Sequence, residues 1–255
     1  MRLIDTHCHL YLKEFENDLP EVIERARNAG VERFYLPAID SKVIDDMLRL
    51  EALYPGDFFS MMGLHPGSVK ENYKDELSIV KDYLHKRKFV AVGEVGLDFY
   101  WDTTYIKQQF EAFNMQMELA LSYNLPIVIH TRNAMKETID AVKPFAEKGL
   151  SGIFHCFGDS NETAKKIISM GFYLGIGGVL TYKKANLAEA LKDIELKHIV
   201  LETDAPYLSP IPYRGKRNES SYIIKVAEKL AEIHNLPVEE IARITTSNAE
   251  KIFQC

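Results

Sequence analysis

The stretch Leu3-Ile4-Asp5-Thr6-His7-Cys8-His9, at residues 3–9, joins a short apolar run to a closely spaced pair of histidines. A short apolar run that ends in polar residues predicts a buried β-strand. Because successive side chains of a strand point to opposite faces, His7 and His9 face one side and Cys8 faces the other. Two imidazoles on one side of a strand end can bind the same metal ion, so this stretch predicts a strand that leads into a metal site.

Similar apolar runs recur along the chain and alternate with charged amphipathic stretches. Eight strands are predicted: Leu3–His7, Arg33–Pro37, Phe58–Gly63, Phe89–Glu94, Pro126–His130, Gly152–His155, Phe172–Gly175 and His198–Glu202. Helices are predicted between the strands and after the last one: Asp18–Ala29, Lys42–Leu53, Lys74–Leu84, Ile106–Ser122, Met135–Lys148, Glu162–Met170, Leu187–Lys192, Ser221–Ile233 and Val238–Ile252. This alternation indicates a parallel sheet. Eight such units predict an α/β fold, a TIM-type (β/α)8 barrel made by a single domain over residues 1–255. A doubly wound open sheet is the alternative, because the strand count could be off by one or two.

Length and composition agree with this interpretation. The chain has 255 residues, 46% of them hydrophobic and 27% charged, and one α/β barrel commonly uses a chain of this length. The formal net charge of -6 argues against a basic protein that coats DNA, but it allows a local basic patch beside a site. The three cysteines, Cys8, Cys156 and Cys255, form no visible disulfide framework, and the sequence shows no signal peptide and no long apolar segment. We therefore expect a cytoplasmic protein without a membrane span.

Four more candidate metal ligands follow predicted strands. Glu94, His130 and His155 end the fourth, fifth and sixth strands, and Asp204 lies two residues beyond the eighth. In a parallel barrel these strand ends meet at one face, where the active sites of this fold lie. The sequence thus predicts four histidines and two carboxylates around one opening.

This set of side chains suits two divalent ions. The predicted arrangement has His7, His9 and Asp204 on one ion, His130 and His155 on the other, and Glu94 between them. Imidazole suits zinc, and carboxylates also admit magnesium and manganese, so Mg²⁺, Mn²⁺ and Zn²⁺ all fit. Two such ions can activate a water and polarise a phosphoryl or carbonyl oxygen. Most isolated histidines bind no metal, and His85, His198 and His234 are therefore predicted to be surface residues.

The order and spacing of the motifs resemble those of the TatD family of metal-dependent hydrolases. The matching segments are Asp5-Thr6-His7-Cys8-His9, Gly93-Glu94-Val95-Gly96-Leu97-Asp98, Leu125-Pro126-Ile127-Val128-Ile129-His130-Thr131-Arg132, Phe154-His155-Cys156-Phe157, Leu201-Glu202-Thr203-Asp204-Ala205-Pro206-Tyr207, Arg214-Gly215-Lys216-Arg217-Asn218-Glu219 and Thr246-Ser247-Asn248-Ala249. The resemblance implies a TIM barrel, two divalent ions and nuclease activity on DNA. It also implies the same six ligands: His7, His9, Glu94, His130, His155 and Asp204. The chain departs from the family pattern at Tyr11, where an acid is common, at Phe157-Gly158-Asp159, where Phe-Ser-Gly is common, and at Ser220, where proline is common.

The predicted reaction is hydrolysis of DNA phosphodiester bonds, in an exonuclease mode, by a metal-activated water. Asp204 and Glu94 are the predicted catalytic residues, and Asp204 is expected to accept the proton of the water. Asp5 and Glu202 are expected to orient the metal-binding imidazoles, with a capping or packing role as the alternative.

Substrate phosphates require donors at the same face of the barrel. His65 and Arg132 lie two residues beyond the third and fifth strands, and Arg214 follows the eighth, so these three are predicted to bind substrate. Further candidates are Lys183, Lys184, Lys216 and Arg217, for which a solvated charge run is an equal alternative. The run Phe99-Tyr100-Trp101 follows Glu94 and would either stack on bases or pack locally.

Two other functions stay open. The same barrel and metals could hydrolyse a small cyclic amide, lactone or phosphotriester, since a fold does not fix a function. Related amide hydrolases often bridge their metals with a modified lysine at the fourth strand, whereas this chain has Glu94 there, which favours phosphodiester cleavage. A non-catalytic binding protein is the third interpretation, and the complete ligand set argues against it. DNA is the predicted substrate; the sequence indicates no membrane and no obligate protein partner, and it leaves the oligomeric state open.

Overall fold

Eight short strands form the centre of the molecule in the computed structural model, which describes residues 1–254. In chain order they are β1 (Leu3–Asp5), β2 (Val31–Pro37), β3 (Phe58–Met61), β4 (Val92–Asp98), β5 (Ile127–Arg132), β6 (Gly152–Phe154), β7 (Tyr173–Ile176) and β8 (Ile199–Leu201). Each of the predicted strands is present. The strands are parallel and neighbours in sequence pair with each other, as in a TIM-type barrel.

The ring of strands consists of two arcs that meet at two seams. One arc contains β1, β2 and β3, and the other contains β4 to β8. A bridge between Met62 and Val92 joins the end of β3 to β4, and a bridge between Cys8 and Ala205 joins the segments that follow β1 and β8. The first and last strands are therefore neighbours, an arrangement that the doubly wound open sheet does not have.

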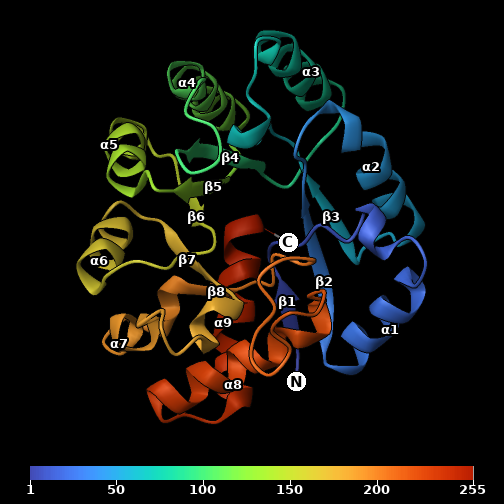
Figure 1. The fold of residues 1–255 in the computed structure, drawn as a ribbon, viewed down its shortest axis with the longest axis vertical. Coiled ribbons are helices and arrows are strands. Elements are labelled where there is room, and N and C mark those ends of the chain that lie inside the picture. Colours follow the sequence, from blue (N-terminus) through green and yellow to red (C-terminus); the bar gives the residue numbers. More distant parts are fainter. Residues whose placement is uncertain (255) are drawn as a thin grey trace.

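Helices surround the strands on the outside. In chain order the longer ones are α1 (Leu19–Asn28), α2 (Ile44–Leu53), α3 (Tyr73–Lys86), α4 (Ile106–Tyr123), α5 (Met135–Ala146), α6 (Asn161–Ser169), α7 (Leu187–Leu191), α8 (Ile223–His234) and α9 (Val238–Phe253). Figure 1 shows α1 to α8 in sequence around the ring. Each is amphipathic in the manner of α1, whose Val22, Ile23 and Ala26 are buried against the strands. Within residues 1–254, no helix has the length and apolar character that crossing a bilayer requires.

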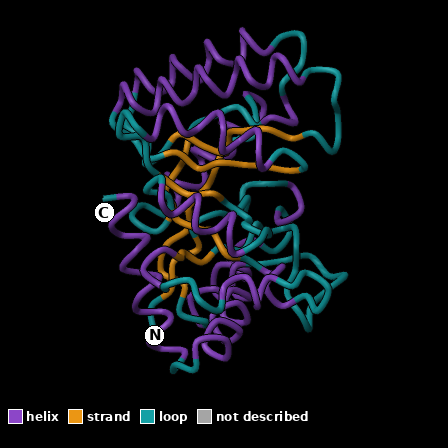
Figure 2. The backbone as a smooth tube through the Cα atoms, turned by 90° about the vertical axis from the view of Figure 1, so that its left-hand side faces the viewer, coloured by secondary structure: helices purple, strands orange, loops and turns teal. Residues whose placement is uncertain are grey.

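The interior of the barrel is apolar at the amino ends of the strands. The side chains that gather there come from all parts of the ring: Ile4, Tyr35, Met61, Ala91, Val128, Ile153, Tyr173 and Val200. Helix α9 closes this end, since Ala249, Ile252 and Phe253 belong to the same cluster and the Phe253 ring stacks on Tyr35 at a centroid distance of 3.9 Å. Figure 2 shows the chain termini on one side of the barrel and the longest loops on the opposite side. The polar side chains of the site therefore lie at the end away from α9.

Strands β4 and β5 extend further than the sequence pattern predicts. Their pairing continues to Asp98 and Arg132, so Glu94 and His130 lie within the strands, and their predicted positions at strand ends were wrong. The physical reason is that pairing between strands, and not the local apolar run, determines where a strand ends. Gly96 allows this pairing, because its φ is +150° and a Cβ there would collide with the carbonyl oxygen of His130.

The long segment at residues 205–218 is held by a buried amide. The Asn218 side chain donates to the carbonyls of Thr203 (2.7 Å) and Tyr207 (2.6 Å), and its oxygen accepts from the amide of Glu219 (2.9 Å). These hydrogen bonds fix the main chain on both sides of Asp204, the ligand candidate that follows β8.

Candidate metal centre

Glu94 occupies the centre of a buried cluster at the carboxyl ends of the strands. Its Oε1 lies 2.7 Å from Nδ1 of His130 and 2.9 Å from Nε2 of His155. Its Oε2 lies 3.2 Å from Nε2 of His7. The fold thus brings imidazoles from three other strands or strand ends to one carboxylate of β4.

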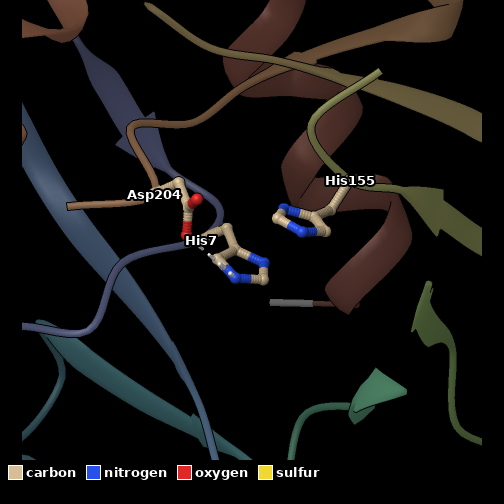
Figure 3. A group of neighbouring side chains, drawn as sticks. All are labelled: His7, His155 and Asp204. Carbon is tan, nitrogen blue, oxygen red and sulfur yellow. Dashed lines mark ion pairs between the residues drawn. The ribbon is translucent and has the colours of Figure 1, made fainter. Parts of the chain in front are cut away.

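Asp204 approaches the same cluster from the segment after β8. Its Oδ1 lies 3.7 Å from Nε2 of His7 and 3.4 Å from Nε2 of His9. Its amide donates to the carbonyl of His7 (2.9 Å) across the seam, so closure of the barrel sets its position. Figure 3 shows Asp204, His7 and His155 around a common space, with the two imidazoles stacked at 3.9 Å.

The candidate donor atoms form three overlapping groups. Within each group the atoms lie within 4.8 Å of one another, and the groups are His7, His155 and Asp204; His7, His9 and Glu94; and His65, Glu94 and His130. All six predicted ligands are therefore brought together. The division differs from the predicted one in three respects. His155 groups with His7 and Asp204, His9 groups with Glu94, and His65 joins His130.

His65 lies at the edge of this cluster, with Nε2 at 3.4 Å from Oε1 of Glu94. Its Nδ1 accepts a hydrogen bond from the amide of Gly67 (2.9 Å). A neutral imidazole carries one proton, so Nε2 holds it and can donate to a carboxylate or to a substrate oxygen. This tautomer suits the predicted contact with substrate better than metal binding.

His9 is held in the opposite tautomer by Tyr11. The hydroxyl of Tyr11 donates to the carbonyl of Pro37 (2.5 Å), which can only accept. Tyr11 must therefore accept from Nδ1 of His9, at 2.9 Å. The proton of His9 is placed on Nδ1, and the lone pair of Nε2 points toward Glu94 and Asp204, as a metal ligand requires.

Asp98 has a role in the cluster that no sequence motif assigned to it. Its Oδ2 accepts from Nε2 of His130 at 3.0 Å. Burial acts to raise the pKa of Asp98, but hydrogen bonds from His130 and from the amides of Tyr100 and Trp101 lower it to about 2. The ionised carboxylate holds a proton on Nε2 of His130 and leaves Nδ1 facing Glu94. The alternation of strand side chains is a signal for this residue, because Glu94 and Asp98 share one face of β4.

Both carboxylates at the centre are anions among imidazoles. Burial acts to raise the pKa of Glu94, but the surrounding imidazoles, with His155 first among them, hold it well below its usual value. Burial acts to raise the pKa of Asp204 too, but the imidazoles around it, His155 and His7 among them, hold it below its usual value. Buried anionic oxygens next to imidazole nitrogens are a donor set that fits divalent cations such as zinc or manganese.

A family model described as TatD related DNase matches residues 4–254. The chain belongs to the TatD-related DNase family. The predicted resemblance is thereby confirmed. Among relatives, YabD of Bacillus subtilis, described as an uncharacterized metal-dependent hydrolase, is 40% identical over 254 residues. The alignment covers 99% of this chain and 99% of YabD. YcfH of Escherichia coli (strain K12), described in the same words, is 31% identical, with 99% of this chain and 96% of YcfH aligned.

Solved structures confirm the TIM-type barrel of this TatD-family chain. The crystal structure of YjjV, a TatD homologue from Escherichia coli K12, matches with a TM-score of 0.93 at 29% identity. The match covers 100% of this chain and 98% of YjjV. The barrel and its connections are therefore shared along the whole chain.

The two carboxylates predicted to orient imidazoles take different positions in this TatD-family site. Asp5 accepts from the amide (3.0 Å) and the hydroxyl (2.6 Å) of Thr203, and so ties β1 to the segment after β8. Glu202 accepts from the amide of Cys156 (2.6 Å) and lies 3.3 Å from Nδ1 of His155. Glu202 thus adjoins an imidazole of the cluster, whereas the hydrogen bonds of Asp5 with Thr203 fix the main chain.

The basic residues at this face divide into exposed and paired ones. Arg132, the last residue of β5, is exposed, and Arg214 is exposed with its guanidinium over the ring of Tyr182 at 4.3 Å. Arg217 instead donates to both carboxylate oxygens of Asp18 (2.8 and 2.7 Å). Arg132 and Arg214 keep exposed charge that a phosphate can reach, whereas the charge of Arg217 is largely neutralised within the fold.

Proposed function

We propose that this chain is a metal-dependent hydrolase that cleaves phosphodiester bonds of DNA as an exonuclease. The observation that carries the proposal is the gathering of Glu94 and Asp204 with four imidazoles in one buried cluster at the open end of the barrel. The family description, TatD related DNase, and the metal-dependent hydrolases among the relatives support it.

Two divalent ions, Mg²⁺, Mn²⁺ or Zn²⁺, belong to this proposal. The ligands would be His7, His9, His130, His155, Asp204 and, shared between the ions, Glu94. When bound, the ions would polarise a phosphoryl oxygen and lower the pKa of a water molecule. The oxygen and nitrogen atoms of the cluster are suitable ligand atoms for both ions.

The protein side chains would position the substrate and move a proton. Asp204 would accept the proton of the attacking water, because its carboxylate lies at the cluster and a main-chain hydrogen bond to His7 fixes its place. His65, with its proton on Nε2, would donate to a phosphoryl oxygen. Arg132 and Arg214 would offset the negative charge of the DNA strand.

The test compares carboxylate and amide side chains that have nearly the same shape. Asp204→Asn and Glu94→Gln should each lower the rate of hydrolysis of end-labelled DNA by roughly 10²–10⁴-fold, the range of a lost general base. Asp140→Asn is the matched control, since Asp140 lies on the surface and pairs only with Lys136 among the described residues. Each variant is metal-stripped and refilled with a single ion, and thermal melting checks the fold. Full turnover in either site variant would remove the proposal.

The second candidate is hydrolysis of a small cyclic amide, lactone or phosphotriester at the same cluster. The cluster itself suits both functions. The exposed Arg132 and Arg214 favour DNA, because their charge suits a chain of phosphates. Assays with end-labelled single- and double-stranded DNA and with a lactone and a cyclic amide decide between them. Turnover of the small substrates and of no DNA would establish the second function.

The proposal treats residues 1–255 as one catalytic domain that acts in the cytoplasm. The support for one domain is the shared apolar cluster, which takes side chains from around the ring and from α9. The support for the compartment is that Cys8 and Cys156 are free thiols, as is usual in a reducing environment.

A further inference from the structure

Two aromatic side chains beside the cluster are exposed to solvent. Phe99 is partly buried and faces Phe110, at a centroid distance of 6.1 Å. The next two residues differ: Tyr100 is 52% exposed and Trp101 is 71% exposed, the highest value among the large apolar side chains of the described residues. Their rings meet edge to face at 4.9 Å. Packing in the core therefore explains why an aromatic residue stands at Phe99, but it does not explain the exposed rings of Tyr100 and Trp101.

A cation accompanies these rings. The guanidinium of Arg132 lies 3.9 Å from the ring centroid of Tyr100 and 5.1 Å from that of Trp101. Among residues 1–254, no carboxylate oxygen lies within ion-pair distance of Arg132. Its charge remains available to an anion while its flat face rests on an aromatic ring.

The rings have a fixed place relative to the metal centre. One oxygen of Asp98 contacts Nε2 of His130 at 3.0 Å, and the other accepts from the amides of Tyr100 (2.9 Å) and Trp101 (3.2 Å). The side chain of Gln109 donates to the carbonyl of Asp98 (3.0 Å) and accepts from its amide (2.8 Å). The carboxylate of Asp98 thus binds both His130, a candidate metal ligand, and the main chain of the aromatic segment. The two rings therefore lie at the edge of the site.

We propose that Trp101, Tyr100 and Arg132 form a subsite for an unpaired nucleotide of the DNA strand, with the base on the indole and the phosphate on the guanidinium. This inference rests on the proposed nuclease function. A flat exposed ring can stack on any base, because every base has a π face. Bases within a duplex already stack on both neighbours, so the subsite favours single strands and frayed ends over blunt duplex DNA.

The chain has one tryptophan, so its fluorescence reports on this subsite alone. Binding is measured in the Asp204→Asn background, where hydrolysis is suppressed. The probes are oligodeoxythymidine, an abasic phosphodiester strand of equal length and a blunt duplex. We expect oligodeoxythymidine to quench the fluorescence saturably, and the abasic strand and the duplex to leave it nearly unchanged. Equal quenching by the abasic strand would overturn the proposal.

Substitutions then test the contribution of the indole to affinity, read by anisotropy of labelled strands. Trp101→Ala should weaken binding of oligodeoxythymidine by roughly 5- to 150-fold, from the usual stacking contribution of about 1–3 kcal/mol per base. Trp101→Phe should restore most of the affinity, and the abasic strand should bind both variants as it binds the parent. Tyr123→Ala, which removes another exposed ring at the end of α4, is the matched control.

The outcomes separate the subsite from the nuclease. If the chain with Asp204 intact cuts single-stranded DNA and Trp101→Ala does so with an unchanged KM, the subsite is refuted and the nuclease stands. If no DNA is bound or cut, both proposals fall.

Discussion

Replacing Tyr11 with phenylalanine removes one hydroxyl and leaves the ring in place. In the intact protein this hydroxyl donates to the carbonyl of Pro37 and accepts from Nδ1 of His9. Without it, nothing described in this cluster fixes the proton of His9 on Nδ1, and the ring can turn or take the other tautomer. The Nε2 lone pair is then no longer held toward Glu94 and Asp204.

The expected magnitudes follow from these two contacts. Removing a partner that orients a metal-binding histidine typically lowers metal affinity by about 10- to 100-fold. We expect the lower end, about 10-fold, because only one of the predicted ligands is affected. The buried carbonyl of Pro37 also loses its donor, which should cost about 1–3 kcal/mol of unfolding free energy in the metal-free protein.

The assay measures Zn²⁺ and Mn²⁺ affinity by competition with a chromophoric chelator, together with denaturant unfolding of the metal-free protein. Tyr73→Phe is the control, because the Tyr73 hydroxyl is likewise bonded to a protein group, Glu111, but touches no imidazole of the cluster. The control should lose some stability and keep its metal affinity. An affinity for both metals within two-fold of the parent in Tyr11→Phe would refute the tautomer reasoning.

Two further predictions concern the backbone and a thiol. Gly96→Ala should lower the unfolding free energy by more than about 2 kcal/mol, because a Cβ there meets the carbonyl of His130. Gly158→Ala should change the unfolding free energy little, because a Cβ there meets only the carbonyl oxygen of Cys156, at an ordinary contact distance of 3.9 Å. Equal unfolding midpoints for the two variants would contradict this. Burial and neighbouring carboxylates raise the pKa of Cys156 to about 12, so its thiolate is abundant only above that pH. At pH 8 its alkylation, followed by peptide mass spectrometry of the metal-free protein, should run about 10³-fold slower than that of an ordinary cysteine, and rapid labelling at pH 8 would count against the raised pKa.

The fold and the membership of the cluster could be predicted because barrel topology determines both. His7 and Asp204 are far apart in sequence, but parallel strands in sequential order bring their carboxyl ends to one face. Once eight strands are recognised, every polar residue that follows a strand is a candidate. The position of a ligand within its strand could be wrong, as it was for Glu94 and His130, without changing the face on which it lies.

The contacts that tune the cluster were less predictable, because they depend on geometry between distant segments. Tyr11 departs from the family pattern, and its role appears only when the Pro37 carbonyl of β2 is placed beside it. Arg217 belongs to a basic run that suggests phosphate binding, but Asp18 at the start of α1 lies close enough to pair with it. No local sequence pattern places Tyr11 beside Pro37 or Arg217 beside Asp18.

The seam between β1 and β8 links the activity to the completeness of the chain. During synthesis His7 and His9 are made early and Asp204 is made late. Asp204 reaches the two histidines only when the segment after β8 pairs with the segment after β1. Fragments cut anywhere between the two seam segments lose the covalent link that holds this junction in register. The proposed hydrolysis thus requires both seam segments to be joined in one ring.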